Sequence, residues 1–189
     1  MNTLNRDKIL YISKRLGLSH IGSCLSVLPI LEEIYRIKKP QDKVVLSNAH
    51  AHLAHLITRT PYYSDETIED LIKKDIHCNR GAGCDASGGS LGHGLGISIG
   101  YALAGYNVHC IVSDGSMMEG SEWEALRIIG GLGFPIKIYT NFNGYTAVSH
   151  ADFYTLKTRM SQFVKGIEFR QTDNTEGFRG VQGHYQILE

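Results

Sequence analysis

The sequence predicts an α/β fold with a mainly parallel sheet and helices on both faces. Short β-branched runs alternate with amphipathic helical segments along the chain, which is the pattern of strand–helix–strand units. Right-handed crossovers in such a sheet place helices on both of its faces. No repeat, low-complexity tract or Gly/Ser/Pro-rich linker divides the 189 residues, so residues 1–189 are interpreted as a single domain.

The first 75 residues predict helices around one early strand. Apolar residues at helical spacing indicate helices over 5–18, 26–37, 50–60 and 64–75. The β-branched run "KVVLS" (43–47) predicts a buried strand. Pro29 requires that its helix begin nearby, because proline is tolerated in a first helical turn. Ser64 is the expected N-cap of the helix over 64–75, whose first turn is acidic and whose last turn is basic.

The second half predicts a glycine-rich loop and then alternating strands and helices. The loop covers 80–96, "RGAGCDASGGSLGHGLG", and leads into a helix of small apolar residues over 97–106. The same criteria predict further strands over 107–113, 136–140 and 167–172, and helices over 121–132 and 151–163.

Charge and hydropathy argue against binding to nucleic acids or membranes. Lys+Arg and Asp+Glu are both 19, so no basic excess is available to hold a polyanion. The first 20 residues lack the apolar centre of a signal peptide. No apolar run reaches the ~18 residues of a spanning helix. A cytoplasmic location is expected.

The four cysteines, Cys24, Cys78, Cys84 and Cys110, predict buried free thiols. None forms a Cys-x-x-Cys pair, and neither His77–Cys78 nor His109–Cys110 has finger-like spacing. Free thiols suit a reducing compartment, and no zinc site is expected from this pattern.

Three predicted strands end in polar residues. Ser47–Asn48 with His50, Ser113–Asp114, and Asn141 with Asn143 follow the strands over 43–47, 107–113 and 136–140. Ligands of open α/β sheets bind beyond the carboxyl ends of the strands, at a topological switch point. These residues are therefore expected to converge on one site.

Asp114 is the most informative of these polar residues. A lone Asp-Gly pair predicts only a turn and a helix cap. Here Asn143 follows one strand–helix–strand crossover later, which places an amide oxygen beside the carboxylate. These are hard oxygen ligands, and a partly filled oxygen site suits Mg²⁺, which completes its octahedron with phosphate oxygens and water. Gly115 allows phosphate to approach the backbone closely.

Four ordered motifs resemble the N-terminal, diphosphate-binding domain of the transketolase family. They are "SHIGSCLSVLPILEEIY", "LSNAHAHLAHLI", "ASGGSLGHGLGISIGYALAG" and "SDG", followed after a spacer by "TNFNGY". Together they cover most of residues 8–147. The family pattern is Gly-Asp-Gly, a spacer and Asn; this chain has Ser113 at the first position and a short segment after Asn143. The resemblance implies thiamine diphosphate and Mg²⁺ as cofactors.

The resemblance assigns metal ligands residue by residue. Asp114 and Asn143 match the two side-chain ligands, and Tyr145 would supply a backbone carbonyl. Asn141 is an alternative to Asn143 in a register shifted by two residues, and the spacing from Asp114 favours Asn143.

The resemblance also implies cofactor contacts. His50 matches a histidine near diphosphate and substrate, Gly115 would offer its backbone N–H to the diphosphate, and His184 matches a late histidine that faces the diphosphate. Gly89 and Leu91 match the loop around the aminopyrimidine and thiazolium rings. Glu119, also placed among the cofactor-binding residues, and Glu124 match acids at the subunit interface.

Histidines are the candidate catalytic residues. His20 matches a histidine that faces the substrate, where it can hydrogen-bond a hydroxyl or move a proton near neutral pH. His50 is placed beside it, and His77 matches a histidine near the terminal hydroxyl of the donor. His52, two residues after His50, is expected to pack in the interior or lie on the surface.

Catalysis in this family also needs a pyrimidine domain, which supplies an acid to the pyrimidine ring. The chain is therefore expected to be a split subunit that pairs with a pyrimidine-domain (C-terminal transketolase-like) subunit, as a homodimer within a heterotetramer. The predicted reaction moves a two-carbon ketol unit from a ketose (phosphate) to an aldehyde, so the substrates are small sugars.

Two alternatives stay open at this stage. One is an alpha-type subunit of another thiamine-diphosphate enzyme: a two-oxoacid decarboxylase or dehydrogenase, or a deoxyxylulose-phosphate-synthase-like enzyme. The other is a degenerate, non-catalytic copy that only binds a partner. The motifs "SHIGSCLS" and "GGSLGHG" favour the transketolase branch, and the presence of Asp114 and Asn143 counts against the non-catalytic copy.

Overall fold

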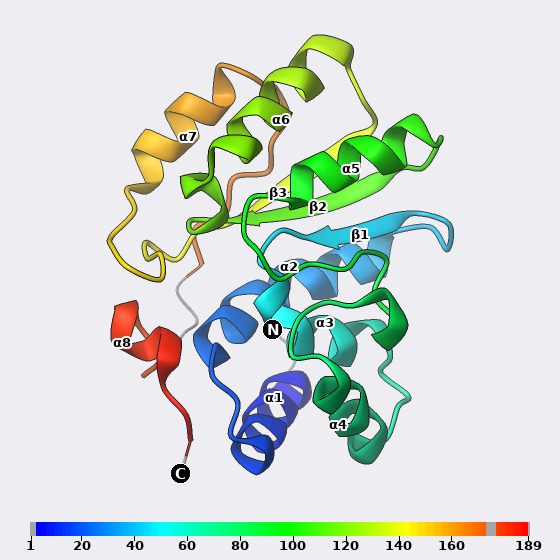
Figure 1. Cartoon of the computed structure of the whole chain (residues 1–189), viewed down its shortest axis with the longest axis vertical. Helices are drawn as coiled ribbons and strands as arrows, with labels where there is room; N and C mark the ends of the chain where they lie inside the picture. The colour runs from blue at the N-terminus through cyan, green and yellow to red at the C-terminus, as the bar shows by residue number, and fades with distance from the viewer. Residues whose placement is uncertain (1–2, 173–176, 189) are drawn as a thin grey trace.

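A three-stranded parallel sheet forms the centre of the fold (Figure 1). The computed structural model describes residues 3–172 and 177–188. The strands are β1 (Lys43–Leu46), β2 (Val108–Ser113) and β3 (Ile136–Asn141), in the order β1-β2-β3. In the register, Lys43 pairs with Val108 and Ser113 pairs with Asn141. The predicted α/β class with a parallel sheet is confirmed.

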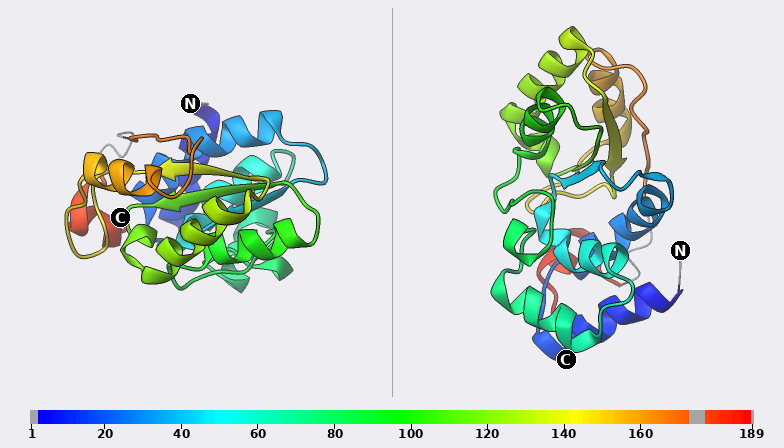
Figure 2. Two further views of the ribbon diagram at one scale, coloured as in Figure 1. Left: turned by 90° about the horizontal axis from the view of Figure 1, so that it is seen from above. Right: turned by 90° about the vertical axis from the view of Figure 1, so that its right-hand side faces the viewer.

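Helices cover both faces of the sheet, as Figures 1 and 2 show. On one face lie α2 (Ile21–Ile37) and α3 (His52–Arg59), and α1 (Thr3–Leu16) and α4 (Asp65–Lys74) pack beyond them, away from the sheet (Figure 1). The other face packs against α5 (Gly94–Leu103), α6 (Gly120–Leu132) and α7 (Phe153–Ser161). A hydrophobic core lies on each face of the sheet, and successive residues of β2 point into alternate cores. Ile111 faces the core on the α2 side, the first core, and Cys110 and Val112 face the core on the α5 side, the second core.

Helix α2 departs from the sequence-based prediction. It begins at Ile21 instead of residue 26, so Pro29 lies inside the helix rather than in its first turn. Proline there removes the hydrogen bond to the carbonyl four residues earlier. Burial offsets this loss, because Ile21, Leu25 and Leu28 are fully buried in the first core. The apolar face that extends back to Ile21 decides where the helix begins.

Other helix boundaries agree closely with the expected ones. Ser64 caps α4 by accepting from the backbone N–H of Thr67, and Asp152 caps α7 in the same way. The predicted helix over 50–60 is divided into a short 3-10 turn, Ala49–Ala51, and α3. Further 3-10 turns span Arg80–Ala82 and Ser116–Met118, and a short helix that the sequence did not predict, α8, spans Gly180–Tyr185.

The predicted fourth strand is not a regular strand. Residues 168–172 run parallel to β3 and make only two isolated bridges, Tyr139 to Glu168 and Phe142 to Gln171. Thr140 and Phe142 donate backbone hydrogen bonds to this segment. The segment extends the sheet at its edge without forming a ladder.

The described strands lie in chain order, so the expected topological switch point is absent among them. The polar strand ends nevertheless meet at one edge, because all three strands are parallel. None of the described helices is long and apolar enough to cross a membrane.

Candidate functional site

The carboxyl ends of the three strands open into one cavity of about 220 Å³. The sequence-predicted residues His20, His50, His77, Gly89, Leu91, Asp114, Gly115, Asn141, Asn143, Tyr145 and His184 all line it. The structure therefore brings together, in one place, the expected metal-ligand, phosphate-binding and histidine residues.

Asp114 lies at the base of this cavity with one oxygen unsatisfied. The residue is 1% exposed, and Oδ2 accepts a 2.7 Å hydrogen bond from the backbone N–H of Asn143. Oδ1 is buried without a hydrogen-bond partner among the described residues. Burial raises the pKa of this carboxyl to about 7, against the opposing effect of the backbone hydrogen bonds. An unpartnered buried oxygen is costly unless a ligand completes it.

The two asparagines after β3 have different surroundings. Asn141 is fully engaged: its Nδ2 donates to Ser26 and its Oδ1 accepts from the hydroxyl of Thr172. Asn143 has only its Oδ1 engaged, by the backbone N–H of Tyr145 at 3.0 Å, and its backbone N–H holds Asp114. These contacts favour Asn143 over Asn141 as the metal ligand, and the assignment remains a prediction.

Ser113, which differs from the family pattern, is accommodated in the turn. Its hydroxyl accepts from the N–H of Ser116 at 3.2 Å, and the hydroxyl of Ser116 accepts from the N–H of Ser113 at 2.9 Å. Gly115 lies against Leu91, and a Cβ at Gly115 would be 3.3 Å from the Leu91 side chain. The turn thus presents the backbone of Gly115 to the cavity with little room for a side chain.

Three histidine rings cluster in the lining of the cavity. The ring centroids of His20 and His50 are 4.9 Å apart, and that of His184 lies 4.3 Å from His20. His20 is the one non-glycine residue with positive φ (61°) in the described chain, a conformation that is enriched at functional sites. Its backbone N–H donates to the carbonyl of His184. His50 Nε2 lies 3.2 Å from the hydroxyl of Ser23.

Burial and mutual repulsion keep these rings neutral. Desolvation first, and then the charges of His184 and His77, lower the pKa of His20 to about 4. Desolvation and the neighbouring histidines lower the pKa of His50 to about 3. Neutral imidazoles can donate one hydrogen bond and accept another, which suits phosphate or hydroxyl groups.

We expect these lowered pKa values to make stability depend on pH. Histidines of the unfolded chain have a pKa near 6.5, whereas the folded rings, with their lowered pKa values, resist protonation. Their contribution is therefore fully present above pH 6.5 and is lost as pH falls toward 4, by about 1.4 kcal/mol per pH unit for each ring. Asp114, whose pKa is raised, acts in the opposite sense.

Urea unfolding of the unliganded chain at pH 7.5 and pH 5 measures this effect. Comparing the change in the free energy of unfolding between wild type and His50→Asn isolates the contribution of one ring. The variant should lose less stability on acidification. His93→Asn, at an exposed position, is the control and should follow wild type. Equal losses in wild type and His50→Asn would contradict the prediction.

His77 lies at the far side of the cavity beside the glycine-rich loop. Its backbone N–H donates to Asp75 Oδ1 at 2.9 Å. Gly89 faces the His77 ring, and a Cβ there would lie 3.7 Å from it. His77 lines the cavity, and its expected role near the donor's terminal hydroxyl remains a prediction.

Glu119 is the one predicted cofactor-binding residue outside the cavity lining. It is exposed and lies beside Gly92, where a Cβ would be 2.6 Å from that of Glu119. The structure therefore gives no support for a cofactor contact by Glu119 within this chain. A surface position is compatible with the interface role that the resemblance implies for Glu119 and Glu124.

Three further residues were not assigned by sequence. Asn48 is fully buried at the end of β1, and both its amide atoms lack partners among the described residues. Glu122 is fully buried and accepts from the Ser47 hydroxyl and the Leu95 N–H, which anchors the start of α5 beside β1. Arg179 is exposed at the cavity and is its single Lys or Arg among the described lining residues. The sequence predicts Asn48 at this site, as a polar residue directly after a strand, but assigns it no specific role.

The fold also explains how the chain's end reaches this site. A Cβ at Gly22 would lie 2.5 Å from the carbonyl oxygen of Phe178, and one at Gly183 would lie 2.3 Å from its carbonyl carbon. Gly22 thus allows the segment before α8 to lie against the start of α2, and Gly183 allows α8 to fold back against that segment. Figure 1 shows α8 beside the start of α2. This packing places His184 over the cavity beside His20.

The residues present fit a metal ion and a phosphate group. The unpartnered buried atoms at the cavity include Asp114 Oδ1, His20 Nδ1 and the amide of Asn48. They combine a hard oxygen ligand with groups that can donate to anionic oxygens. A ligand of this kind would satisfy groups that otherwise carry a desolvation cost.

Comparison with known proteins finds several sequence relatives of this chain. No protein-family model matches the chain. It is 30% identical over 162 residues to "6-deoxy-6-sulfo-D-fructose transketolase subunit SqwG" of Clostridium sp. (strain MSTE9), covering 70% of this chain and 59% of that one. It is 34% identical over 143 residues to transketolase-like protein 2 of Bos taurus, covering 62% of this chain and 22% of that protein. Human transketolase is 30% identical over 151 residues, which cover 66% of this chain and 24% of that enzyme.

Solved structures share the fold. Transketolase from Campylobacter jejuni superposes with a TM-score of 0.65 at 19% identity, over 84% of this chain and 31% of that one. Transketolase from Leishmania mexicana gives a TM-score of 0.65 at 16% identity, over 89% and 36% of the two chains.

The chain thus spans about three fifths of one relative, a named subunit, and about a quarter or less of the full-length enzymes. On the evidence of its sequence relatives and its fold, this chain belongs to the transketolase family.

Proposed function

We propose that this chain is the diphosphate-binding subunit of a thiamine-diphosphate-dependent transketolase. It would move a two-carbon ketol unit from a ketose to an aldehyde, together with a pyrimidine domain on another chain. In this proposal residues 1–189 act as a single diphosphate-binding domain.

The observation that carries this proposal is the Asp114–Asn143 pair at the cavity base. The carboxylate has one oxygen held by Asn143 and one oxygen without a partner. A Mg²⁺ ion needs few protein ligands and fills its remaining positions with phosphate and water oxygens. Asp114, Asn143 and the carbonyl of Tyr145 would hold the metal, and the metal would bind the diphosphate.

The remaining groups of the cavity divide into cofactor and substrate contacts. The N–H of Gly115 would donate to a phosphate oxygen, and Leu91 would pack against the ring system and exclude water. Thiamine diphosphate, when bound, supplies the electron sink for cleavage and formation of the carbon–carbon bond. The neutral rings of His20 and His50 would orient a substrate hydroxyl and take up or release its proton.

Arg179 supports an anionic or strongly polar substrate tail. It contributes a positive charge to the cavity lining, and a guanidinium binds phosphate or sulfonate oxygens through paired hydrogen bonds. The Clostridium relative is named for a sulfo-ketose. We propose that the donor of this chain is a ketose with a polar or anionic terminus.

Cofactor titration followed by turnover measurements tests the proposal. Calorimetry of the chain with its partner should show saturable thiamine diphosphate binding that requires Mg²⁺. His20→Asn and His50→Asn should each lower ketol-transfer turnover at least about tenfold, since positioned acid–base groups contribute roughly 10²–10⁴-fold.

His109→Asn is the matched control for these variants. His109 is buried on β2, where it faces Asp42 and Tyr139, outside the cavity lining. It should retain turnover near that of wild type. Circular dichroism shows whether each variant folds. Folded His20→Asn and His50→Asn variants with wild-type turnover would contradict the assigned roles, and unfolding of both would show that these histidines are structural.

A further inference from the structure

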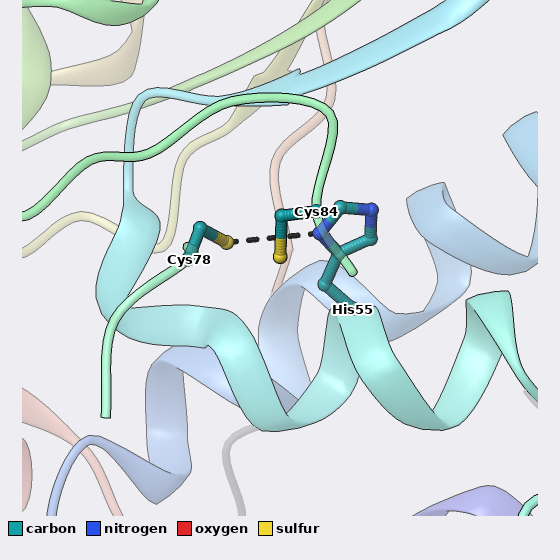
Figure 3. Close-up of side chains that lie close together, drawn as sticks. All are labelled: His55, Cys78 and Cys84. Carbon is teal, nitrogen blue, oxygen red and sulfur yellow. Dashed lines mark hydrogen bonds between the residues drawn. The ribbon is translucent and has the colours of Figure 1, made fainter. Parts of the chain in front are cut away.

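A second group of chemically active side chains lies buried away from the strand ends. His55 of α3 and Cys78 and Cys84 of the loop after α4 point toward one another (Figure 3). One ligand atom from each lies within 4.8 Å of the others, and all three residues are buried. Cys78 Sγ is 3.6 Å from His55 Nδ1.

His52 completes this group from the same helix. It lies three residues before His55, and residues three apart on a helix share a face. His52 is fully buried, and Nδ1 is 3.0 Å from the carbonyl oxygen of Asp75. A carbonyl only accepts, so Nδ1 carries the proton and Nε2 presents its lone pair. Nε2 has no hydrogen-bond partner among the described residues.

His52 lies outside the group of ligand atoms that are within 4.8 Å of one another. Hydrogen bonding by the Cys78 thiol, and then by the rings of His52 and His55, lowers the pKa of Cys84 against the effect of burial. One ring nitrogen of His55 and the sulfurs of Cys78 and Cys84 thus meet in one buried volume, and the buried ring of His52 lies one helical turn before His55. We call His52, His55, Cys78 and Cys84 the His/Cys cluster.

We propose that the His/Cys cluster binds one zinc ion in a closed, tetrahedral structural site. Two thiolates and two imidazoles are a ligand set that zinc prefers, and four protein ligands leave no open position for substrate. The metal assignment concerns residues outside the cavity lining and does not depend on the proposed function.

The distance between the sulfur of Cys78 and the ring nitrogen of His55 agrees with this geometry. Zinc binds sulfur at about 2.3 Å and nitrogen at about 2.05 Å, so a tetrahedral site separates the two atoms by about 3.6 Å. The separation of Cys78 Sγ and His55 Nδ1 is 3.6 Å. The ligand atoms of His55, Cys78 and Cys84 already lie within 4.8 Å of one another, and the His52 ring would move toward them to complete the site.

The other ring nitrogen of each histidine makes a contact that orients the imidazole. Ligating histidines usually donate their other ring N–H to a carbonyl, carboxylate or similar acceptor. His52 does so to Asp75, and His55 Nε2 lies 2.7 Å from the hydroxyl of Tyr35. Each ring is thus held with its remaining nitrogen toward the thiols.

A disulfide between the two cysteines is the main competing arrangement. It would leave the inward nitrogens of His52 and His55 without an ion or a thiol proton to bind. Unsatisfied buried polar groups are costly, so the two histidines favour metal. The sequence-based expectation of simple free thiols considered only adjacent His–Cys pairs, and the fold instead joins a helical His-x-x-His pair to cysteines of the following loop.

The proposed ion would fix the loop that carries part of the cavity. Cys78 directly follows His77, its N–H donates to the carbonyl of Ala49, and its carbonyl accepts from Gly88. Between α4 and α5 the chain contains only the 3-10 turn at Arg80–Ala82, and loops of this length need other support. Metal at the His/Cys cluster would tie this loop to α3, next to His50.

Metal analysis of the full chain tests the proposal. The chain is produced with zinc in the medium and purified without chelator, thiamine diphosphate or added Mg²⁺. Elemental analysis should find about one zinc per chain. Cys84→Ser should lose most of this zinc, and Cys110→Ser, a buried cysteine on β2 in the second core, should keep it. The absence of thiamine diphosphate makes the result independent of the cofactor site.

Cobalt titration of the zinc-free wild-type chain gives a result that needs no variant. Co²⁺ alone should saturate at about one equivalent, with thiolate charge-transfer bands and the intense visible bands of tetrahedral coordination. Zinc should displace it. A wild-type chain without zinc and without these bands would overturn the proposal, and so would a Cys78–Cys84 disulfide found by mass spectrometry in protein purified under reducing conditions.

Discussion

Replacement of Asp114 by asparagine is expected to abolish Mg²⁺-dependent binding of thiamine diphosphate. Asp114 is the single carboxylate in the described cavity lining, so the variant removes the charged ligand while keeping the shape. Loss of even outer-shell partners costs about 10–100-fold in metal affinity, and loss of a ligand should cost at least about 100-fold. The fold should survive, because an amide oxygen can still accept from the N–H of Asn143 and burial already disfavours the charge.

Calorimetry with the partner subunit present measures this effect. Asp42→Asn is the matched control: that carboxylate is also buried, but it binds Lys39 and Asn107 outside the cavity lining. Asn143→Ala should weaken cofactor binding strongly, and Asn141→Ala much less, since the Asn141 amide is satisfied by Ser26 and Thr172. Unchanged cofactor affinity in a folded Asp114→Asn variant would disprove the metal assignment.

The convergence of strand ends could be predicted from sequence, because it follows from local patterns and one topological rule. Each β-branched run ends in polar residues, and parallel strands bring their carboxyl ends to one edge. Asp114 and Asn143 meet because a single crossover separates them, and the structure joins them by one hydrogen bond. The pattern required no knowledge of the distant parts of the chain.

The clustering of the His20, His50 and His184 rings depends on contacts that local sequence patterns do not encode. His184 reaches the cavity because Phe178, just before α8, packs on Gly22 of α2, across most of the sequence. Neither the short helix nor its docking has a periodic signal. The same is true of Pro29, which lies inside α2 because distant core contacts outweigh a local rule.

Buried polar residues were also missed for a physical reason. Glu122 reads in the sequence as one more acid at the start of an amphipathic helix, yet it is fully buried against Ser47 and Leu95. His52 is buried, in agreement with one of its two expected positions, but nothing in the sequence indicated that its ring would hydrogen-bond the carbonyl of Asp75. Such roles arise only when separate elements meet.

The largest effect should come from the partner subunit. The cavity lies at one edge of a single sheet, and closing a site excludes water, strengthens its electrostatics and protects reactive intermediates. Exposed apolar side chains flank the cavity: Val148 is 82% exposed next to Ala147, and Met118 is 52% exposed after the Gly115 turn. We propose that a pyrimidine-domain chain covers them and supplies the activating acid, with two copies of each chain in the assembly.

Ketol transfer by the 189-residue chain alone should therefore be undetectable. Activity should rise in proportion to complex formed when a pyrimidine-domain chain is added, measured with a ketose donor, an aldehyde acceptor and saturating thiamine diphosphate and Mg²⁺. Val148→Asp and Met118→Asp should reduce complex formation and activity together, because each would bury an unpaired charge. Leu4→Asp, at an exposed position on α1, is the control and should leave both unchanged. Robust turnover by the isolated chain, free of any co-purifying protein, would disprove the requirement for a partner and place the activating acid within this chain.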